Sequence, residues 1–148
     1  MSEIQIQLIS AEQTWPLRLK VLRPHQTLKD CIYPQDHWPS TFHVGAFRTD
    51  HVVGVATFHE EESPHFRVHH PYRLRGMATD FSFHSQGIGR KVLEKAFFEL
   101  RLRECDFLWC NAREVAFPFY EKLGFQYFGP LFDIHTLGPH KIMYRSLL

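Results

Sequence analysis

The sequence predicts a mixed α/β fold, in which helices flank one central sheet within a single domain spanning residues 1–148. Three observations lead to this prediction. The length of 148 residues fits one domain with a sizeable core. Segments with strand-like alternation and segments with a helical apolar stripe follow one another along the chain. No internal repeat, linker or low-complexity tract divides the sequence.

The first forty residues are predicted to form a strand, a helix and a loop. Residues 4–8 alternate apolar and polar side chains, as in a half-buried strand. The run S-A-E-Q from Ser10 resembles a capping box, and the apolar stripe after it predicts a helix that ends at Pro24. Residues 25–40 contain two prolines and several polar residues, which predicts a loop with room for a short helical turn.

Three strands are predicted in the middle of the chain. Residues 41–47 and 51–58 are strand-like runs joined by R-T-D, a short hairpin connection. The acidic run at residues 60–64 predicts a polar turn. Residues 71–81 alternate again and lead directly into the sequence F-H-S-Q-G-I-G-R at residues 83–90.

The C-terminal part begins with the most regular helix of the chain. We predict a strand over residues 106–112, a helix over residues 113–123 that Gly124 ends, and two strands over residues 126–134 and 141–147. The regular helix follows the segment F-H-S-Q-G-I-G-R. It carries an apolar face at spacings of three and four, formed by Ile88, Val92, Leu93, Ala96, Phe97 and Leu100.

Charge and hydropathy narrow the functional class. Seventeen Lys and Arg against sixteen Asp and Glu give a net charge of +1, which provides no electrostatic footprint for nucleic acid and no polybasic membrane anchor. No apolar run approaches the ~20 residues of a membrane span. The alternating start is unlike a signal peptide, and three cysteines suit free, buried thiols in a reducing compartment. We therefore expect a cytoplasmic protein that binds neither nucleic acid nor membrane.

Eleven histidines raise the question of a metal site. His59, His65 and the pair at residues 69–70 lack a carboxylate or cysteine partner at a recognised metal-binding spacing. The sequence therefore predicts no metal.

The segment F-H-S-Q-G-I-G-R precedes the regular helix. The first N–H groups of a helix lack intrahelical partners and carry partial positive charge, so they suit an anion. Gly87 and Gly89 would let a ligand approach the backbone, and Arg90 adds a positive charge. The segment is neither a P-loop nor a complete G-x-G-x-x-G motif. By itself, the glycine pair more often marks a helix that starts after glycine for steric reasons.

Taken with the rest of the C-terminal half, the segment resembles the GCN5-related N-acetyltransferase (GNAT) superfamily. H-S-Q-G-I-G at residues 84–89 matches the family pattern [Arg/Gln]-x-x-Gly-x-[Gly/Ala], with His84 where the family usually has Arg or Gln. Further along, W-C-N-A-R-E-V-A-F-P-F-Y-E-K-L-G-F resembles the family's strand–helix unit. The clear resemblance covers residues 72–128, and the order of elements extends it to the whole chain.

The resemblance implies a mostly antiparallel sheet that is split around the co-substrate acetyl-CoA. By resemblance, the strand residues Met77, Ala78 and Thr79 would hold the acetyl carbonyl and pantetheine through the backbone, and Asn111 would bind the CoA arm. An alternative role for Asn111 is to cap the helix that follows. The loop and helix start that would bind the pyrophosphate comprise His84, Ser85, Gln86, Gly87, Ile88, Gly89 and Arg90.

The resemblance also suggests which residues would transfer protons and stabilise charge during the reaction. Tyr120 would act as the general acid that protonates the departing thiolate, or would be only a core aromatic residue. The Met77 N–H would stabilise the oxyanion. No general base is assigned, and the candidates are the carboxylates of residues 60–62, Asp133 and His140.

The expected function is therefore the transfer of an acetyl group from acetyl-CoA to a primary amine of a small molecule or peptide. The alternative is a non-catalytic module that binds or senses acyl-CoA. The near-neutral net charge argues against a strongly acidic or basic acceptor. By resemblance, the loop over residues 25–40 and the C-terminal strands would select the acceptor, and a homodimer is left open.

Overall fold

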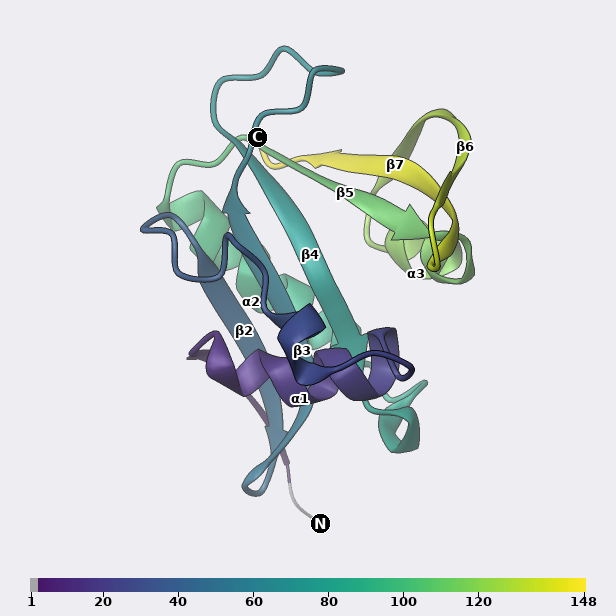
Figure 1. Ribbon diagram of the computed structural model, residues 1–148. Coiled ribbons are helices and arrows are strands. Elements are labelled where there is room, and N and C mark those ends of the chain that lie inside the picture. The colour runs from purple at the N-terminus through teal and green to yellow at the C-terminus, as the bar shows by residue number, and fades with distance from the viewer. Residues whose placement is uncertain (1–2) are drawn as a thin grey trace.

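The computed structural model describes residues 3–148, so Met1 and Ser2 of the predicted domain lie outside the described residues. Its centre is one seven-stranded sheet with the order β1-β2-β3-β4-β5-β7-β6 (Figure 1). Every neighbouring pair is antiparallel except β4 and β5, which are parallel. The predicted mixed α/β class is confirmed. The strands are β1 (Ile4–Ile9), β2 (Phe42–Arg48), β3 (His51–Glu60), β4 (Pro71–Thr79), β5 (Phe107–Arg113), β6 (Gln126–Ile134) and β7 (Gly138–Ser146).

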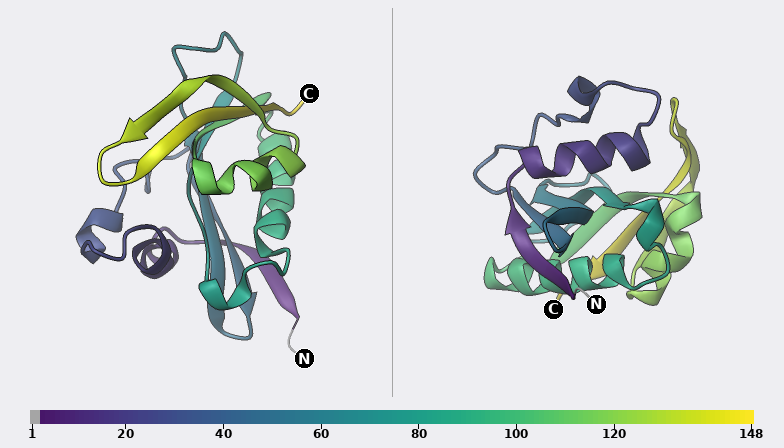
Figure 2. Two further views of the ribbon diagram at one scale, coloured as in Figure 1. Left: turned by 90° about the vertical axis from the view of Figure 1, so that its right-hand side faces the viewer. Right: turned by 90° about the horizontal axis from the view of Figure 1, so that it is seen from below.

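Helices cover both faces of the sheet. A helical segment over residues 12–22, which contains α1 (Trp15–Leu17), lies on one face, and α2 (Ile88–Leu102) and α3 (Phe117–Lys122) lie on the other (Figure 2). The capping box predicted at Ser10 is present, because its N–H donates to Gln13 Oε1 at 2.9 Å and its Oγ accepts from the Gln13 N–H at 3.3 Å.

The main core lies between α2 and the sheet. All six residues predicted for the apolar face of α2 are buried, and they pack with residues from the middle strands. Burying side chains of this size stabilises a fold by about 1.5–3 kcal/mol each. The helical period of the sequence therefore fixes which side of α2 faces the sheet.

A bulge in β4 interrupts its pairing with β3. Val55 pairs with Ala78 and Thr57 pairs with Arg75, so β4 has one residue more than β3 between these pairs. Gly76 lies in this interval with φ of +62°, which disfavours any residue with a side chain. On its other side β4 pairs with β5 over only three residues, which end at Arg73, and the two strands diverge before the bulge is reached (Figure 1).

The predicted helix over residues 113–123 starts too early. β5 continues to Arg113, which pairs with His140 of β7, and a 3₁₀ turn over Glu114–Ala116 precedes α3. The pairing with β7 holds Arg113 extended, and this partner lies far along the chain, where local periodicity carries no information about it. Gly124 ends the helix as predicted, with φ of +88°.

Two further predictions concern membrane-spanning segments and the state of the cysteines. Within residues 3–148, no helix has both the length and the apolar character to cross a membrane. Cys31, Cys105 and Cys110 are free and buried, as predicted. Burial raises the pKa of the Cys110 thiol to about 12, so it stays protonated at neutral pH and does not provide a thiolate nucleophile.

Candidate functional site

A cavity of about 170 Å³ lies where β4 and β5 diverge. Strands, helix α3 and the loop after α1 all contribute to its walls, so the cavity exists only in the folded chain. Its lining comprises Leu22, Arg23, Tyr33, residues 73–77 of β4, Cys110, Asn111 and Arg113 of β5, Ala116, Phe119 and Tyr120, and Ile134, Leu137 and His140.

Three of the predicted site residues meet in this cavity. Met77 reaches it from β4, Asn111 from β5 and Tyr120 from α3. Asn111 pairs with Ile142 of β7, two residues before β5 ends at Arg113 and five residues before Ala116, the N-cap of α3. The alternative in which Asn111 caps the following helix is therefore wrong, and its side chain is available to the cavity.

The predicted pyrophosphate loop adjoins the cavity without lining it. A Cβ atom on Gly89 would lie 2.9 Å from the Phe119 ring and 3.2 Å from Met77 Cε. Both neighbours line the cavity, so the first turn of α2 is packed directly behind its wall. Only glycine allows this close approach, which explains the second glycine of the segment.

The N-terminus of α2 has the features of an anion site. Gly87 is the N-cap with φ of +75°, no side chain caps the helix, and its first turn contains no acidic residue. A Cβ on Gly87 would meet nothing within 4 Å, so the space in front of the helix is open. The uncapped N–H groups and the helix dipole together favour a negatively charged group here.

The side chains of the loop contribute unequally. The Ile88 side chain is buried in the core, so only its backbone could face a ligand. Arg90 is exposed and lies 3.9 Å from Glu94 one helical turn later. Ser85 and Gln86 are exposed, and Ser85 has φ of +64°. Backbone N–H groups therefore dominate the polar character of this loop.

His84 helps to shape the loop. Its Nε2 atom lies 3.1 Å from the Thr79 carbonyl oxygen. A carbonyl oxygen only accepts, so Nε2 carries the proton, and in the neutral ring Nδ1 is an acceptor. The neutral imidazole thus closes the turn between β4 and α2 and offers no second N–H to an anion; the protonated ring would offer one.

Tyr120 is 5% exposed and stands at the inner end of the cavity. Its ring packs against Phe119 and Phe125, with centroids 5.1 Å away in each case. Burial, with a smaller contribution from Cys110, raises the pKa of the Tyr120 phenol well above its usual value. The phenol is therefore protonated at neutral pH, which is the form that a proton donor needs.

Of the predicted base candidates, only His140 lines the cavity. Its Nδ1 atom donates to the Gly138 carbonyl oxygen at 2.7 Å, which leaves Nε2 unprotonated in the neutral ring. Glu60 instead lies 2.5 Å from His70 Nε2, and Glu61 lies 3.1 Å from Arg73 Nη1.

The remaining candidates lie at the surface. Glu62 and Asp133 are exposed and are absent from the cavity lining. Within residues 3–148, no three His, Cys, Asp or Glu side chains come together in a way that could hold a metal ion.

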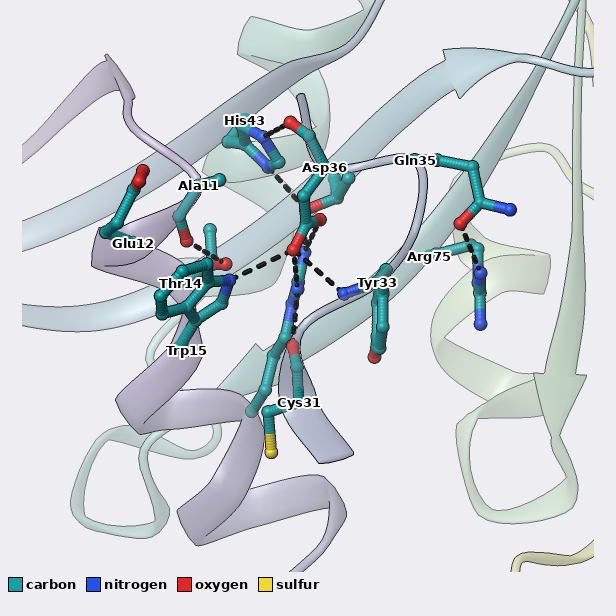
Figure 3. A network of polar contacts seen from close by, with 12 residues as sticks. Ala11, Glu12, Thr14, Trp15, Cys31, Tyr33, Gln35, Asp36, His43 and Arg75 are labelled. Atoms are coloured by element: carbon teal, nitrogen blue, oxygen red, sulfur yellow. Dashed lines mark hydrogen bonds and ion pairs between the residues drawn. The ribbon is translucent and has the colours of Figure 1, made fainter. Parts of the chain in front are cut away.

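A buried polar network supports the cavity from the α1 side (Figure 3). Asp36 receives two hydrogen bonds from the fully buried Arg18, at 2.8 and 2.9 Å, and one from Trp15 Nε1 at 3.0 Å. Burial alone would raise the pKa of Asp36, but these bonds and the Arg18 charge hold it below its usual value. The Tyr33 N–H also donates to Asp36, at 3.0 Å, so the network fixes Tyr33 in the cavity wall.

Sequence reasoning missed four arginines that line the cavity: Arg23, Arg73, Arg75 and Arg113. The alternation R-L-R in β4 places the second and third of these on one face of the strand, and this was the only local signal. The other two come from segments about ninety residues apart, and only the fold brings them together.

Comparisons with known proteins agree on one family. Residues 9–125 match the model of the acetyltransferase (GNAT) family. The chain is 35% identical over 144 residues to "Uncharacterized N-acetyltransferase YitI" of Bacillus subtilis (strain 168), with 97% of each protein covered.

Two solved structures illustrate the likeness of the fold. A putative N-acetyltransferase from Lactobacillus plantarum is 19% identical with a TM-score of 0.77, covering 98% of this chain and 99% of that one. An aminoglycoside 6'-N-acetyltransferase complexed with coenzyme A is 16% identical with a TM-score of 0.75, covering 97% of both chains.

Proposed function

The chain belongs to the acetyltransferase (GNAT) family, and on this premise we propose that it is an N-acetyltransferase. It would move an acetyl group from acetyl-CoA to the primary amine of a small molecule or peptide. The observation that carries the proposal is the close packing of an uncapped helix N-terminus behind a cavity that contains a buried, protonated tyrosine.

The co-substrate fits the loop before α2. The space in front of Gly87 is open, and the N–H groups of the first helical turn have no side-chain partner there. These groups would hold the pyrophosphate, with His84 adding a charge when protonated. Met77, Ala78, Thr79 and Asn111 would align the rest of the molecule along the diverging strands. Acetyl-CoA would supply the acetyl group already activated as a thioester.

Two side chains of the cavity would handle the protons. Nε2 of His140 would accept the proton of the amine, because its Nδ1 is committed to the Gly138 carbonyl. Tyr120 would give its hydroxyl proton to the departing thiolate. Thiols and phenols have ordinary pKa values of about 8.5 and about 10, so a phenol can protonate a thiolate, and the raised pKa of Tyr120 keeps its proton in place until the thiolate departs but makes it a weaker acid than a free phenol.

The first experiment compares Tyr120→Phe with Tyr127→Phe. Both changes remove one phenolic oxygen, but Tyr127 belongs to β6 and does not line the cavity. We expect Tyr120→Phe to lower kcat by about 10²- to 10⁴-fold in an assay for released CoA thiol, because it removes a general acid. Tyr127→Phe should retain the wild-type rate. An unchanged rate in Tyr120→Phe would exclude Tyr120 as the acid.

Thermal unfolding with acetyl-CoA separates the enzyme from its alternatives. A ligand at one hundred times its Kd stabilises the fold by about 2.7 kcal/mol, so the midpoint should rise. A rise without turnover on a broad amine panel would favour the acyl-CoA-sensing module. No rise at all would refute use of the co-substrate.

A further inference from the structure

The cavity concentrates positive charge. Four of its lining residues are arginines, and no aspartate or glutamate lines it. The net charge of +1 taken alone argues against an acidic acceptor, but it averages over the whole surface and does not describe this cavity. The local charge is what a bound acceptor would meet.

One of the four arginines is neutralised within the protein. Arg73 Nη1 lies 3.1 Å from Glu61 Oε2, and its guanidinium stacks over Trp109 with 4.9 Å to the ring centroid. Arg73 therefore has a structural partner and contributes little net charge to the cavity.

Arg23 and Arg113 hydrogen-bond only to neutral groups among the described residues. Arg23 Nη1 donates to Gln26 Oε1 at 3.3 Å, and its buried Nε has no partner in the part of the chain that the structure describes. Arg113 Nη2 donates to the Leu22 carbonyl oxygen at 3.0 Å. Burial lowers the pKa of Arg113, and the Arg23 charge lowers it further.

Arg75 is held firmly in position without a carboxylate. Its Nη1 donates to Gln35 Oε1 at 3.0 Å, and its guanidinium lies 4.3 Å from the centroid of the Tyr33 ring (Figure 3). Tyr33 is fixed in turn by its N–H bond to Asp36. A guanidinium that is already oriented loses little entropy when it binds a planar anion.

We infer that the acceptor is an amine that also carries a carboxylate, and that Arg23, Arg75 and Arg113 bind this carboxylate. The inference rests on the proposed transfer to an amine and names the class of that amine. A guanidinium binds a carboxylate with two parallel hydrogen bonds, and an anion in the cavity would offset the like charges of three partly buried arginines.

The size of the cavity and its positive charge both favour an acceptor that resembles an amino acid. The cavity has a volume of about 170 Å³, and the acyl end of acetyl-CoA would take up part of it, so the acceptor would be a small amine with one compact anionic group. The positive field also disfavours an ammonium group relative to the neutral amine, which is the form that attacks an acyl group. A polycationic acceptor would be repelled.

The test uses matched acceptors in the full chain. L-Phenylalanine is compared with L-phenylalaninamide and 2-phenylethylamine, L-aspartate is compared with L-asparagine, and phosphoethanolamine represents a phosphate-bearing amine. We expect kcat/KM for L-phenylalanine to exceed that for its amide by about tenfold to a hundredfold, as for a charged hydrogen-bond acceptor. Equal or faster transfer to the amide would overturn the inference, and a preference for phosphoethanolamine would replace the carboxylate by a phosphate.

Variants assign the effect to the arginines. Arg75→Gln or Arg113→Gln should bring the ratio of kcat/KM between acid and amide close to one, whereas Arg67→Gln, at an exposed position outside the cavity, should keep it. Two variants are used in case one fails to fold. An unchanged ratio in a folded Arg75→Gln and Arg113→Gln would refute the role of these residues.

A binding measurement separates this inference from the proposed function. Calorimetry with N-acetyl-L-phenylalanine in the presence of CoA needs no turnover. Binding that weakens by about tenfold or more in Arg113→Gln and is retained in Arg67→Gln would support the carboxylate site even if transfer were absent. Binding that is equal in both variants would overturn the site, whether or not the chain is an active transferase.

Discussion

At the scale of single residues, the ring nitrogen that a histidine uses for its hydrogen bond determines which nitrogen remains free for chemistry. His140 and His84 are both histidines whose ring contacts a carbonyl oxygen, but through different nitrogens. His140 uses Nδ1 and keeps Nε2 as an acceptor in a cavity, where it suits a base. His84 uses Nε2 at an exposed turn, where it closes the loop before α2. Residue type alone would treat them alike.

This contrast predicts the effect of His140→Gln. An amide cannot take up the proton of the amine, so we expect kcat/KM to fall by about 10²-fold or more. Initial rates in a CoA-release assay test this. His135→Gln, at an exposed position in the same β6–β7 hairpin, should retain the wild-type rate. A His140→Gln variant with the wild-type rate would assign the base elsewhere.

At the scale of elements, the approach of α2 to α3 connects the two halves of the site. The first turn of α2 would bind the pyrophosphate, and α3 carries Tyr120. Their separation is set at Gly89, where the Phe119 ring occupies the space that a Cβ would need. The distance between the proposed anion site and the proposed proton donor would thus depend on the packing at this contact.

We predict that Gly89→Ala weakens acetyl-CoA binding. The added Cβ would lie 2.9 Å from two atoms of the Phe119 ring, so the helices must move apart, at a cost of about 1–3 kcal/mol for overpacking. That cost corresponds to roughly a five- to hundredfold higher KM for acetyl-CoA. The double variant Gly89→Ala with Phe119→Ala removes the obstructing ring and should recover part of the affinity. Failure of this rescue would show that the contact does not set the spacing.

At the scale of the whole molecule, buried histidines couple stability to pH. His43 is 5% exposed and His59 is fully buried. Burial is the largest cause that lowers the pKa of each below its usual value, although nearby acceptors oppose it. His70 shifts the other way, because its bond to Glu60 raises its pKa, but this pair is partly exposed and screened by solvent.

The fold should therefore lose stability as the solution becomes mildly acidic. Above the ordinary histidine pKa of about 6.5, His43 and His59 are neutral in both the folded and the unfolded state. Their contribution to the free energy of unfolding is then fully present. As the pH falls below that value, the unfolded chain binds protons first, so the free energy of unfolding decreases. Urea unfolding at pH 7.5 and pH 5.5 measures this slope. His69→Gln, at an exposed position, should leave it unchanged, and a fold that is more stable at pH 5.5 would contradict the prediction.

The order of elements and the location of the anion loop follow from local patterns. The apolar face of α2 was predicted completely, since a helical period of 3.6 residues is a property of neighbouring positions. The loop before it was identified by its two glycines and its resemblance to the family, which the comparisons confirmed. The start of α3 was predicted too early, because the extension of β5 depends on pairing with β7.

The sequence by itself thus determined the fold class, the face of α2 that meets the sheet, and Tyr120 as the candidate acid. Only the tertiary structure decided that His140 is the base candidate inside the cavity and that Arg23, Arg75 and Arg113 surround the same space. The physical reason is the range of the interactions. Periodicity and capping act over a few neighbouring residues, whereas the cavity forms where β4 and β5 stop pairing after Arg73 and distant segments close around the gap.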